Sequence, residues 1–198
     1  MQLSRWHADL RIPTLARSSA SESSALTKPE LQTLQQGFCG ITHVSTSDSG
    51  EVCTWHRLVD LQPPESTPDA GWMVFHNTEL LEETGIHGVY REIWQRLPDS
   101  TVRMIALTEL AQRTEQAGVR WLIAGSYAMR VRPAQAPNHL LEISYGRLDL
   151  GYWHLQRSSL PELEGQRIAF SLQRDNEHTA VLQLEKSVSR CAIEEWRE

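Results

Sequence analysis

Short runs of alternating apolar and polar residues recur through the C-terminal half of this chain, and they limit its possible folds more than any other feature. Such runs occupy residues 141–145, 168–172 and 180–184, and turn-forming residues at 174–177 separate the last two. A period of two is typical of β-strands with one buried face. Because no crossover helix is indicated between these strands, the pattern favours an antiparallel barrel or sandwich.

The N-terminal part of the chain carries the same strand period. Residues 6–12 alternate loosely and stop at Pro13, as a terminal or edge strand does. Residues 38–45 and 52–62 then predict two strands joined by Ser47-Asp48-Ser49-Gly50, a turn sequence typical of hairpins. We therefore expect β-structure at both ends of the chain.

A cluster of prolines suggests where one domain ends. Pro63, Pro64 and Pro68 interrupt the strand pattern, with polar residues between them. This boundary predicts an N-terminal incomplete β-domain over residues 1–68 and a C-terminal antiparallel β-barrel over residues 69–198. The fold class that we predict is therefore all-β.

One short helix is predicted at residues 28–36. Thr27 and Glu30 have the spacing of a capping box, and Gly37 stands where a left-handed residue would end the helix. The helix has only a narrow apolar stripe, so we expect it to cover the β-structure and not to form a bundle.

Composition and charge exclude several classes of partner. The 198 residues carry a net charge of −6, and no lysine or arginine cluster interrupts it, so no nucleic-acid partner is expected. No window approaches the roughly 18 apolar residues of a membrane helix, and the start lacks an apolar signal region. We expect a cytoplasmic protein without a membrane partner. Cys39, Cys53 and Cys191 have no CxxC spacing and are expected to be free thiols.

Several short motifs, in colinear order, carry a resemblance to a known family. They are Asp9-Leu10-Arg11-Ile12-Pro13, Gly37-Phe38-Cys39-Gly40-Ile41-Thr42, Glu82-Glu83-Thr84-Gly85, Arg91-Glu92-Ile93-Trp94-Gln95 and Ile143-Ser144-Tyr145-Gly146-Arg147. Together they resemble the Hri family of casein-kinase-interacting fungal proteins and their bacterial relatives. The resemblance covers most of the chain. It implies a calycin-type architecture, in which an incomplete N-terminal β-domain precedes a lipocalin-like barrel, and it implies no reaction.

The strand around residue 90 carries the first candidate site. It follows residues 82–85, which read as a glycine-bearing turn, and its period of two places Tyr90, Glu92 and Trp94 on one face. Glu92 would orient a polar ligand group or act as a general base, or else it is a structural carboxylate among core aromatics. Arg57 is the candidate partner of Glu92, unless its head group reaches solvent.

A second group of candidates lies between residues 119 and 131, which read as one long strand with a bend at Gly125. Trp121 and Tyr127 would share its inward face. The leading function is non-catalytic binding of a small, partly apolar or amphipathic ligand inside the C-terminal barrel. The predicted ligand-binding residues are Arg57, Tyr90, Glu92, Trp94, Trp121, Gly125 and Tyr127.

Two other functions stay open at this point. One is a protein-protein interaction module whose barrel is filled by its own bulky side chains. The other is an enzyme, or a haem-binding barrel, that uses Glu92 or a histidine. The eight histidines include no HxH or HExxH spacing, so neither a metal nor a cofactor is expected. No catalytic residue is predicted, because Gly125-Ser126-Tyr127 lacks the second glycine of a nucleophile elbow.

Overall fold

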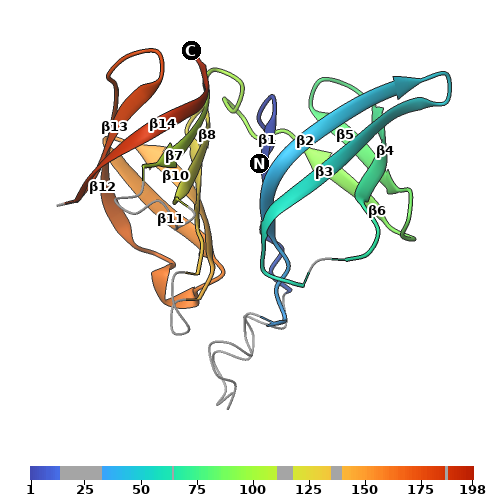
Figure 1. The fold of residues 1–198 in the computed structure, drawn as a ribbon, viewed down its shortest axis with the longest axis horizontal. Coiled ribbons are helices and arrows are strands. Elements are labelled where there is room, and N and C mark those ends of the chain that lie inside the picture. The colour runs from blue at the N-terminus through green and yellow to red at the C-terminus, as the bar shows by residue number, and fades with distance from the viewer. Residues whose placement is uncertain (14–32, 64, 111–117, 135–139, 186) are drawn as a thin grey trace.

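The fold, taken from a computed structural model, consists of two β-structures that lie side by side (Figure 1). The structure describes residues 1–13, 33–63, 65–110, 118–134, 140–185 and 187–198. One part is a curled six-stranded sheet and the other is a closed eight-stranded antiparallel barrel. The all-β prediction is confirmed, and the arrangement is consistent with a calycin-like fold.

The six-stranded sheet contains the first six strands in chain order, and each strand pairs antiparallel with the next. Its strands are β1 (Trp6–Ala8), β2 (Phe38–Ser47), β3 (Gly50–Asp60), β4 (Asp69–Phe75), β5 (Leu80–Gly85) and β6 (Arg91–Gln95). The sheet curls without closing, so it has a concave face and two free edges, β1 and β6.

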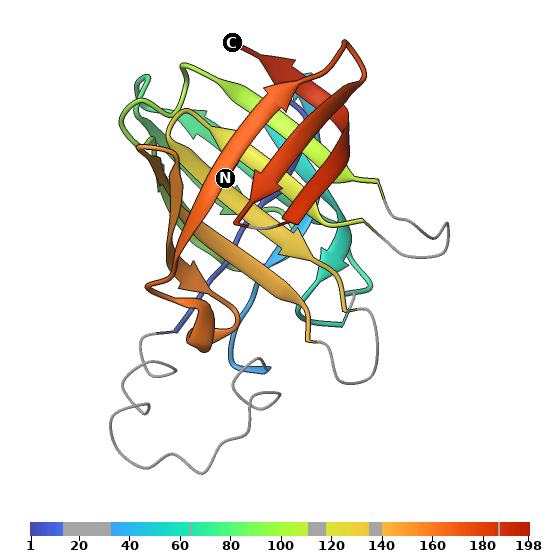
Figure 2. The same ribbon diagram turned by 90° about the vertical axis from the view of Figure 1, so that its left-hand side faces the viewer.

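The barrel contains the remaining eight strands. They are β7 (Met104–Glu109), β8 (Arg120–Ala124), β9 (Tyr127–Arg132), β10 (Glu142–Asp149), β11 (Tyr152–Ser158), β12 (Arg167–Arg174), β13 (Thr179–Leu184) and β14 (Ser187–Arg197). Each strand pairs with its successor, and β14 returns to pair with β7, which closes the barrel (Figure 2). A short 3-10 helix, η1 (Pro161–Leu163), lies between β11 and β12.

The predicted domain boundary at residue 68 is wrong. Strand β4 pairs with β3, with Asp69 opposite Trp55 and Gly71 opposite Cys53, so residues 69–95 belong to the six-stranded sheet. Pro63 and Pro68 fall between β3 and β4, where a missing N–H breaks no ladder. They mark a loop within one sheet, and the first strand of the barrel is β7.

The helix predicted at residues 28–36 falls largely outside the described residues, which resume at Thr33. Near its predicted end, Gln36 forms an antiparallel bridge with Arg11, in which each N–H donates to the other's carbonyl at 3.0 and 2.7 Å. A side chain on Gly37 would lie 2.8 Å from the Asp9 carbonyl oxygen. Gly37 therefore permits a close approach of two backbone segments.

Two local predictions about turns are also corrected. Residues 82–85, read as a turn, form the end of β5, and Gly85 leaves room for the Tyr90 ring, which lies 2.3 Å from where its Cβ would be. The predicted long strand at 119–131 is a hairpin of β8 and β9. Gly125 forms its turn, with a φ of +58° that favours glycine.

The barrel and the sheet share a hydrophobic core. The outer surface of β7 to β10 contributes one side of it, and the N-terminal segment with β1 and β2 contributes the other (Figure 1). The buried members are Leu3, Trp6, Ala8, Cys39, Ala106, Leu122, Ala124, Met129, Val131, Leu141 and Ile143. Each large aliphatic side chain buried there contributes about 1.5–3 kcal/mol. The two β-structures are therefore held as one unit.

Candidate ligand-binding groove

The barrel interior is occupied by its own side chains. Trp121 and Trp153 meet edge to face with ring centroids 5.0 Å apart, and Phe170 contacts Trp121 at 5.7 Å. The other fully buried interior residues include Ile105, Leu107, Ile123, Leu155 and Leu182. Bulky side chains on successive strands fill a barrel of this size.

A buried ion pair adds to this filling. Arg130 Nε donates to Glu142 Oε1 at 2.8 Å, and the Ser144 hydroxyl donates to the same oxygen at 2.6 Å. The guanidinium lies over Trp153, 4.9 Å from the ring centroid. Burial lowers the pKa of Arg130, whereas the Glu142 carboxylate opposes that shift. This pair was not predicted from the sequence, although Arg130 interrupts the apolar run of residues 127–131.

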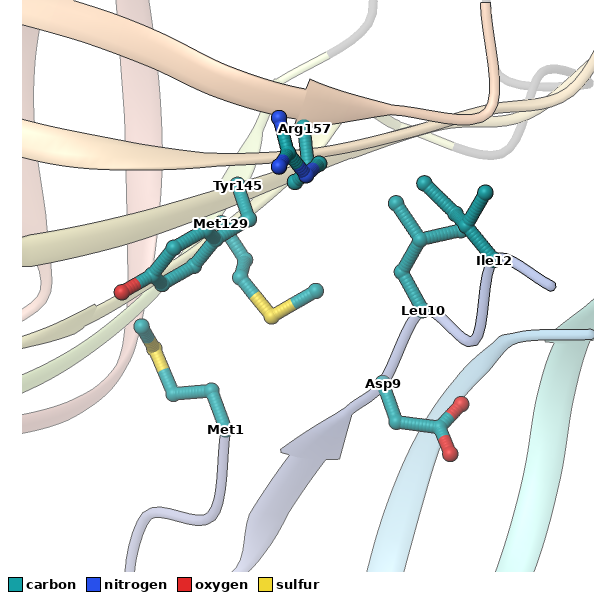
Figure 3. Close-up of a pocket in the computed structure, with 7 residues that line it drawn as sticks. All are labelled: Met1, Asp9, Leu10, Ile12, Met129, Tyr145 and Arg157. Carbon is teal, nitrogen blue, oxygen red and sulfur yellow. The ribbon is translucent and has the colours of Figure 1, made fainter. Parts of the chain in front are cut away.

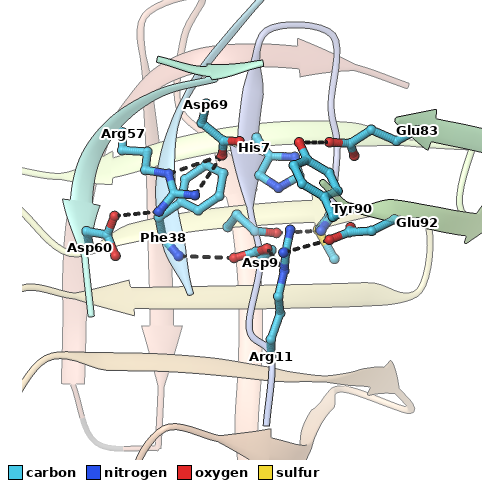
Figure 4. A network of polar contacts seen from close by, with 12 residues as sticks. His7, Asp9, Arg11, Phe38, Arg57, Asp60, Asp69, Glu83, Tyr90 and Glu92 are labelled. Atoms are coloured by element: carbon cyan, nitrogen blue, oxygen red, sulfur yellow. Dashed lines mark hydrogen bonds and ion pairs between the residues drawn. The ribbon is translucent and has the colours of Figure 1, made fainter. Parts of the chain in front are cut away.

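The concave face of the six-stranded sheet has a polar end (Figure 4). Arg57 pairs with Asp60 at 2.9 Å and with Asp69 at 2.7 Å, so its predicted pairing with Glu92 is wrong. The register of β3 and β4 places Asp69 opposite Trp55, next to Arg57 on the same face. The guanidinium also stacks on Phe38, 4.2 Å from the ring centroid.

Glu92 pairs instead with Arg11, whose Nη1 lies 2.7 Å from its Oε1 (Figure 4). Arg11 Nε also donates to Asp9 Oδ2 at 2.8 Å. Arg11 follows β1 and Glu92 lies on β6, so this pair links the two free edges of the sheet. Glu92 is a structural carboxylate in this arrangement, and its neighbour Arg91 points outward and pairs with Glu82.

The Tyr90 hydroxyl donates to Glu83 Oε1 at 2.7 Å (Figure 4). Glu83 is only 2% exposed, and its Oε2 has no hydrogen-bond partner within the described part of the chain. Burial raises the pKa of Glu83 above its ordinary value, although the Tyr90 hydrogen bond opposes the shift. Gly71 makes this carboxyl group possible, because a Cβ there would lie 2.6 Å from Glu83 Cγ.

Aromatic rings fill the middle of the concave face. His7 contacts Phe38, Trp55 and Trp94 with ring centroids 5.1, 5.9 and 5.5 Å away, and the two indoles stack at 6.0 Å. His7 Nδ1 shares a hydrogen bond of 2.8 Å with Gln2 Oε1. Burial holds the pKa of His7 well below its ordinary value, so the ring is neutral at pH 7.

Beyond these rings lies a groove of about 550 Å³ between the sheet and the barrel. Its sheet wall includes Cys53, Trp55, Met73, Phe75, Leu81 and Trp94, and residues 1–4 line one side. Its barrel wall includes Met104, Ala124, Tyr127 and Tyr145. The two tyrosine rings stack with centroids 6.2 Å apart. Apolar and aromatic side chains thus face each other across the groove.

A second cavity, of about 390 Å³, lies along the same interface (Figure 3). Its lining residues are Met1, Asp9, Leu10, Ile12, Met129, Tyr145 and Arg157. Met1 and Tyr145 line both cavities. The second cavity therefore adjoins the groove at these two side chains.

The seven predicted ligand-binding residues do not form one site. Trp94 and Tyr127 line the groove from opposite walls. Arg57, Tyr90 and Glu92 belong to the polar end of the sheet, Trp121 lies in the barrel core, and Gly125 forms a turn. Cys53, Met73 and Tyr145 also line the groove and were not predicted. The alternation of their strands places each of them on a face with other apolar residues, but it does not show what that face contacts.

Two structural findings concern metal-ligand clusters and membrane-spanning helices in the described residues. Within those residues, no group of three or more His, Cys, Asp or Glu side chains could hold a metal ion. No helix in the described part is long and apolar enough to cross a membrane. The three cysteines are free and buried, as predicted.

The comparisons with known proteins add no family assignment. Neither protein-family models, curated proteins nor solved structures gave a match to this chain. The class of protein is therefore defined by the fold alone, an antiparallel barrel joined to a curled sheet. The resemblance to the Hri family stays a prediction.

Proposed function

We propose that this protein binds a small, partly apolar ligand in the groove between the sheet and the barrel, without catalysing a reaction on it. The observation that carries the proposal is the groove itself. Its volume of about 550 Å³ falls within the range typical of ligand sites, which is roughly 300–1,000 Å³. Its walls combine apolar and aromatic side chains with a few polar groups, as such sites do.

The proposal moves the ligand out of the C-terminal barrel, where the sequence analysis expected it. Trp121, Trp153 and their neighbours already occupy that interior. A non-catalytic role is supported by the place of Glu92, whose carboxylate pairs with Arg11 at the polar end of the sheet and does not line the groove.

The family resemblance and the location belong to the same proposal. An incomplete β-domain followed by a closed barrel is the architecture that the Hri resemblance implies, so we retain that family and its calycin-type, lipocalin-like barrel as a hypothesis. Three free, buried thiols accord with a reducing, cytoplasmic location.

A protein-protein interaction module is the second candidate. This function was predicted for a barrel that is filled by its own side chains. The buried side chains inside this barrel therefore favour it. Exposed apolar side chains on the outer surface, such as Val181 and Val188 on β13 and β14, would be available to a partner. If the protein binds ligands in the groove, an apolar probe should bind there. If it is only an interaction module, the probe should not bind.

Titration with the neutral fluorescent probe N-phenyl-1-naphthylamine tests the proposed function. We expect a saturable, one-to-one increase in probe fluorescence. Val44→Trp should weaken binding by about tenfold or more, or about 1.4 kcal/mol, because Val44 lines the groove and is half exposed, so a larger ring fills the space without disturbing the core.

Val74→Trp is the matched control, because Val74 is equally exposed on the same sheet but does not line the groove. This variant should bind the probe like the wild type. Absence of saturable binding, or equal weakening by both variants, would contradict the groove as a ligand site and favour the interaction module.

A further inference from the structure

One strand of the groove wall presents a charge beside the apolar surface. Glu51, Cys53 and Trp55 alternate along β3 and all line the groove. Same-face neighbours on a strand are about 6.6 Å apart, so the backbone of Glu51 lies about 13 Å from that of Trp55. A ligand lying along β3 would therefore contact apolar side chains at one end and a carboxylate at the other.

Glu51 is half-buried, and its carboxylate has neither an ion-pair partner nor a hydrogen bond among the residues that the structure describes. The other groove charges differ. Glu79 and Arg96 lie 4.0 Å apart and offset each other, and Arg197 comes from the exposed end of β14. The Met1 amino group donates to the Ala8 carbonyl. Glu51 is thus the available charge on the sheet wall.

The surroundings of Cys53 point in the same direction. Burial, followed by the nearby carboxylates Glu83, Glu51 and Asp69, raises the pKa of the Cys53 thiol to about 12. Asp69 pairs with Arg57, and burial shifts Glu83 toward its neutral form. Glu51 is therefore the carboxylate of these three that lines the groove, and its charge favours a cationic head group over an anionic one.

We infer that the groove binds an amphipathic amine, whose apolar body packs on Cys53, Met73 and Trp94 and whose ammonium group pairs with Glu51. This inference rests on the proposed function and names the chemical class of its ligand. A fatty carboxylate would meet Glu51 as a like charge and would have to rely on Arg197 at the edge of the groove.

Displacement of bound N-phenyl-1-naphthylamine by three matched competitors tests the inference. The competitors are decylamine, decanol and decanoate, used at pH 7 and low ionic strength below their micelle-forming concentrations. We expect decylamine to displace the probe at a concentration about threefold lower than decanol and about tenfold lower than decanoate, the scale of one partly solvated ion pair. Added salt should reduce the difference.

Glu51→Gln should bring decylamine to the level of decanol while leaving decanol itself unchanged. Asp48→Asn is the control, because it removes the same charge from the exposed turn of the same hairpin, outside the groove lining. This control should retain the amine preference. Glu51 is half-buried and Asp48 is exposed, and neither residue belongs to a hydrophobic core cluster, so both substitutions should leave the core intact.

Two results would overturn the inference while leaving the groove as a ligand site. One is displacement by decanoate at a concentration equal to or lower than that of decylamine. The other is an amine preference that survives in Glu51→Gln or disappears in Asp48→Asn. If the wild type binds no probe at all, the proposed function fails and the inference fails with it.

Discussion

At the scale of single residues, the buried Glu83 carboxyl group makes the clearest unfavourable contribution to the free energy of folding. It is 2% exposed and accepts one hydrogen bond from Tyr90, while its second oxygen has no partner among the described residues. A buried ionised group without full hydrogen bonding destabilises the folded state. Its side chain lies over Gly71 on β4, where a Cβ would overlap it, so the sequence provides the space for it.

We predict that Glu83 makes stability fall as pH rises. Its folded-state pKa lies above the ordinary value of 4.5, so the folded state binds more protons than the unfolded state above that pH. Stability is then full below about pH 4.5 and is lost as pH rises through the folded-state pKa. Glu83→Gln keeps an acceptor for Tyr90 and should remove this loss, with a gain of about 1 kcal/mol at pH 7.

Urea denaturation of both proteins between pH 4.5 and pH 8 measures this effect. The difference in unfolding free energy between the variant and the wild type should grow with pH. Tyr90→Phe is a useful comparison, since it removes the hydrogen bond that the Tyr90 hydroxyl donates to the carboxyl group. Parallel stability curves for Glu83→Gln and the wild type would show that Glu83 does not titrate abnormally.

At the scale of the structural elements, tight turns depend on particular glycines. Gly125 closes the β8–β9 hairpin with a φ of +58°, and a Cβ there would lie 1.7 Å from the Asp99 carbonyl oxygen. Gly151 has a similar φ of +78°, but nothing lies within 4 Å of its Cβ position. Substitutions at these two positions therefore distinguish the cost of a left-handed backbone conformation, present at both, from the cost of steric overlap, present only at Gly125.

We predict that Gly125→Ala destabilises the protein more than Gly151→Ala. The left-handed conformation alone costs about 1–2 kcal/mol for alanine, which is the expected effect at Gly151. Gly125→Ala adds a backbone clash and should cost about 2 kcal/mol more. Thermal or urea unfolding of the two variants provides the comparison. Equal losses would mean that residues 96–103, which connect β6 to β7 and include Asp99, move aside without cost.

The ion pair inside the barrel belongs to the same scale, because it joins β9 to β10. Glu142→Leu leaves the Arg130 guanidinium buried without its carboxylate and should cost about 3–5 kcal/mol. The double variant Arg130→Met with Glu142→Leu removes both charges and should recover most of that loss. Urea denaturation of the single and double variants measures the coupling energy between Arg130 and Glu142. If the double variant loses as much unfolding free energy as the single variants together, the two residues are not coupled.

The elements themselves were largely predictable from the sequence, but their partners were not. Alternation identified the β2–β3 hairpin and the strands at 168–172 and 180–184, because one buried face imposes a period of two. The same alternation runs through β8 and β9 without a visible break, since the turn at Gly125 needs only two residues. Local periodicity also carries no information on which sheet β4 joins.

At the scale of the whole molecule, the candidate site exists only because two β-structures meet. The groove takes one wall from β3 to β6 and the other from the outer face of the barrel, so no contiguous motif encodes it. This explains why Trp94 and Tyr127 were predicted together but assigned to a barrel interior. It also means that the site depends on the interface that holds the sheet against the barrel.

We predict that the interface and the barrel unfold as one cooperative unit. Leu122 faces the shared core from β8, whereas Leu182 lies inside the barrel, and both are fully buried. Replacement of either with alanine should cost about 2–5 kcal/mol. Because the core that contains Leu122 also contains Cys39 and Trp6, Leu122→Ala should lower amide hydrogen-exchange protection in β2 and β3 as well as in the barrel strands.

Leu182→Ala is the matched test of this cooperativity, since its side chain has no part in the shared core. In a single cooperative unit it lowers protection in β2 and β3 by the same free energy as in β12 and β13. Loss of protection confined to the barrel strands would show that the two β-structures unfold separately. In that case, unfolding of either part would open the groove. A bound ligand would then stabilise both parts, because it binds only when both are folded.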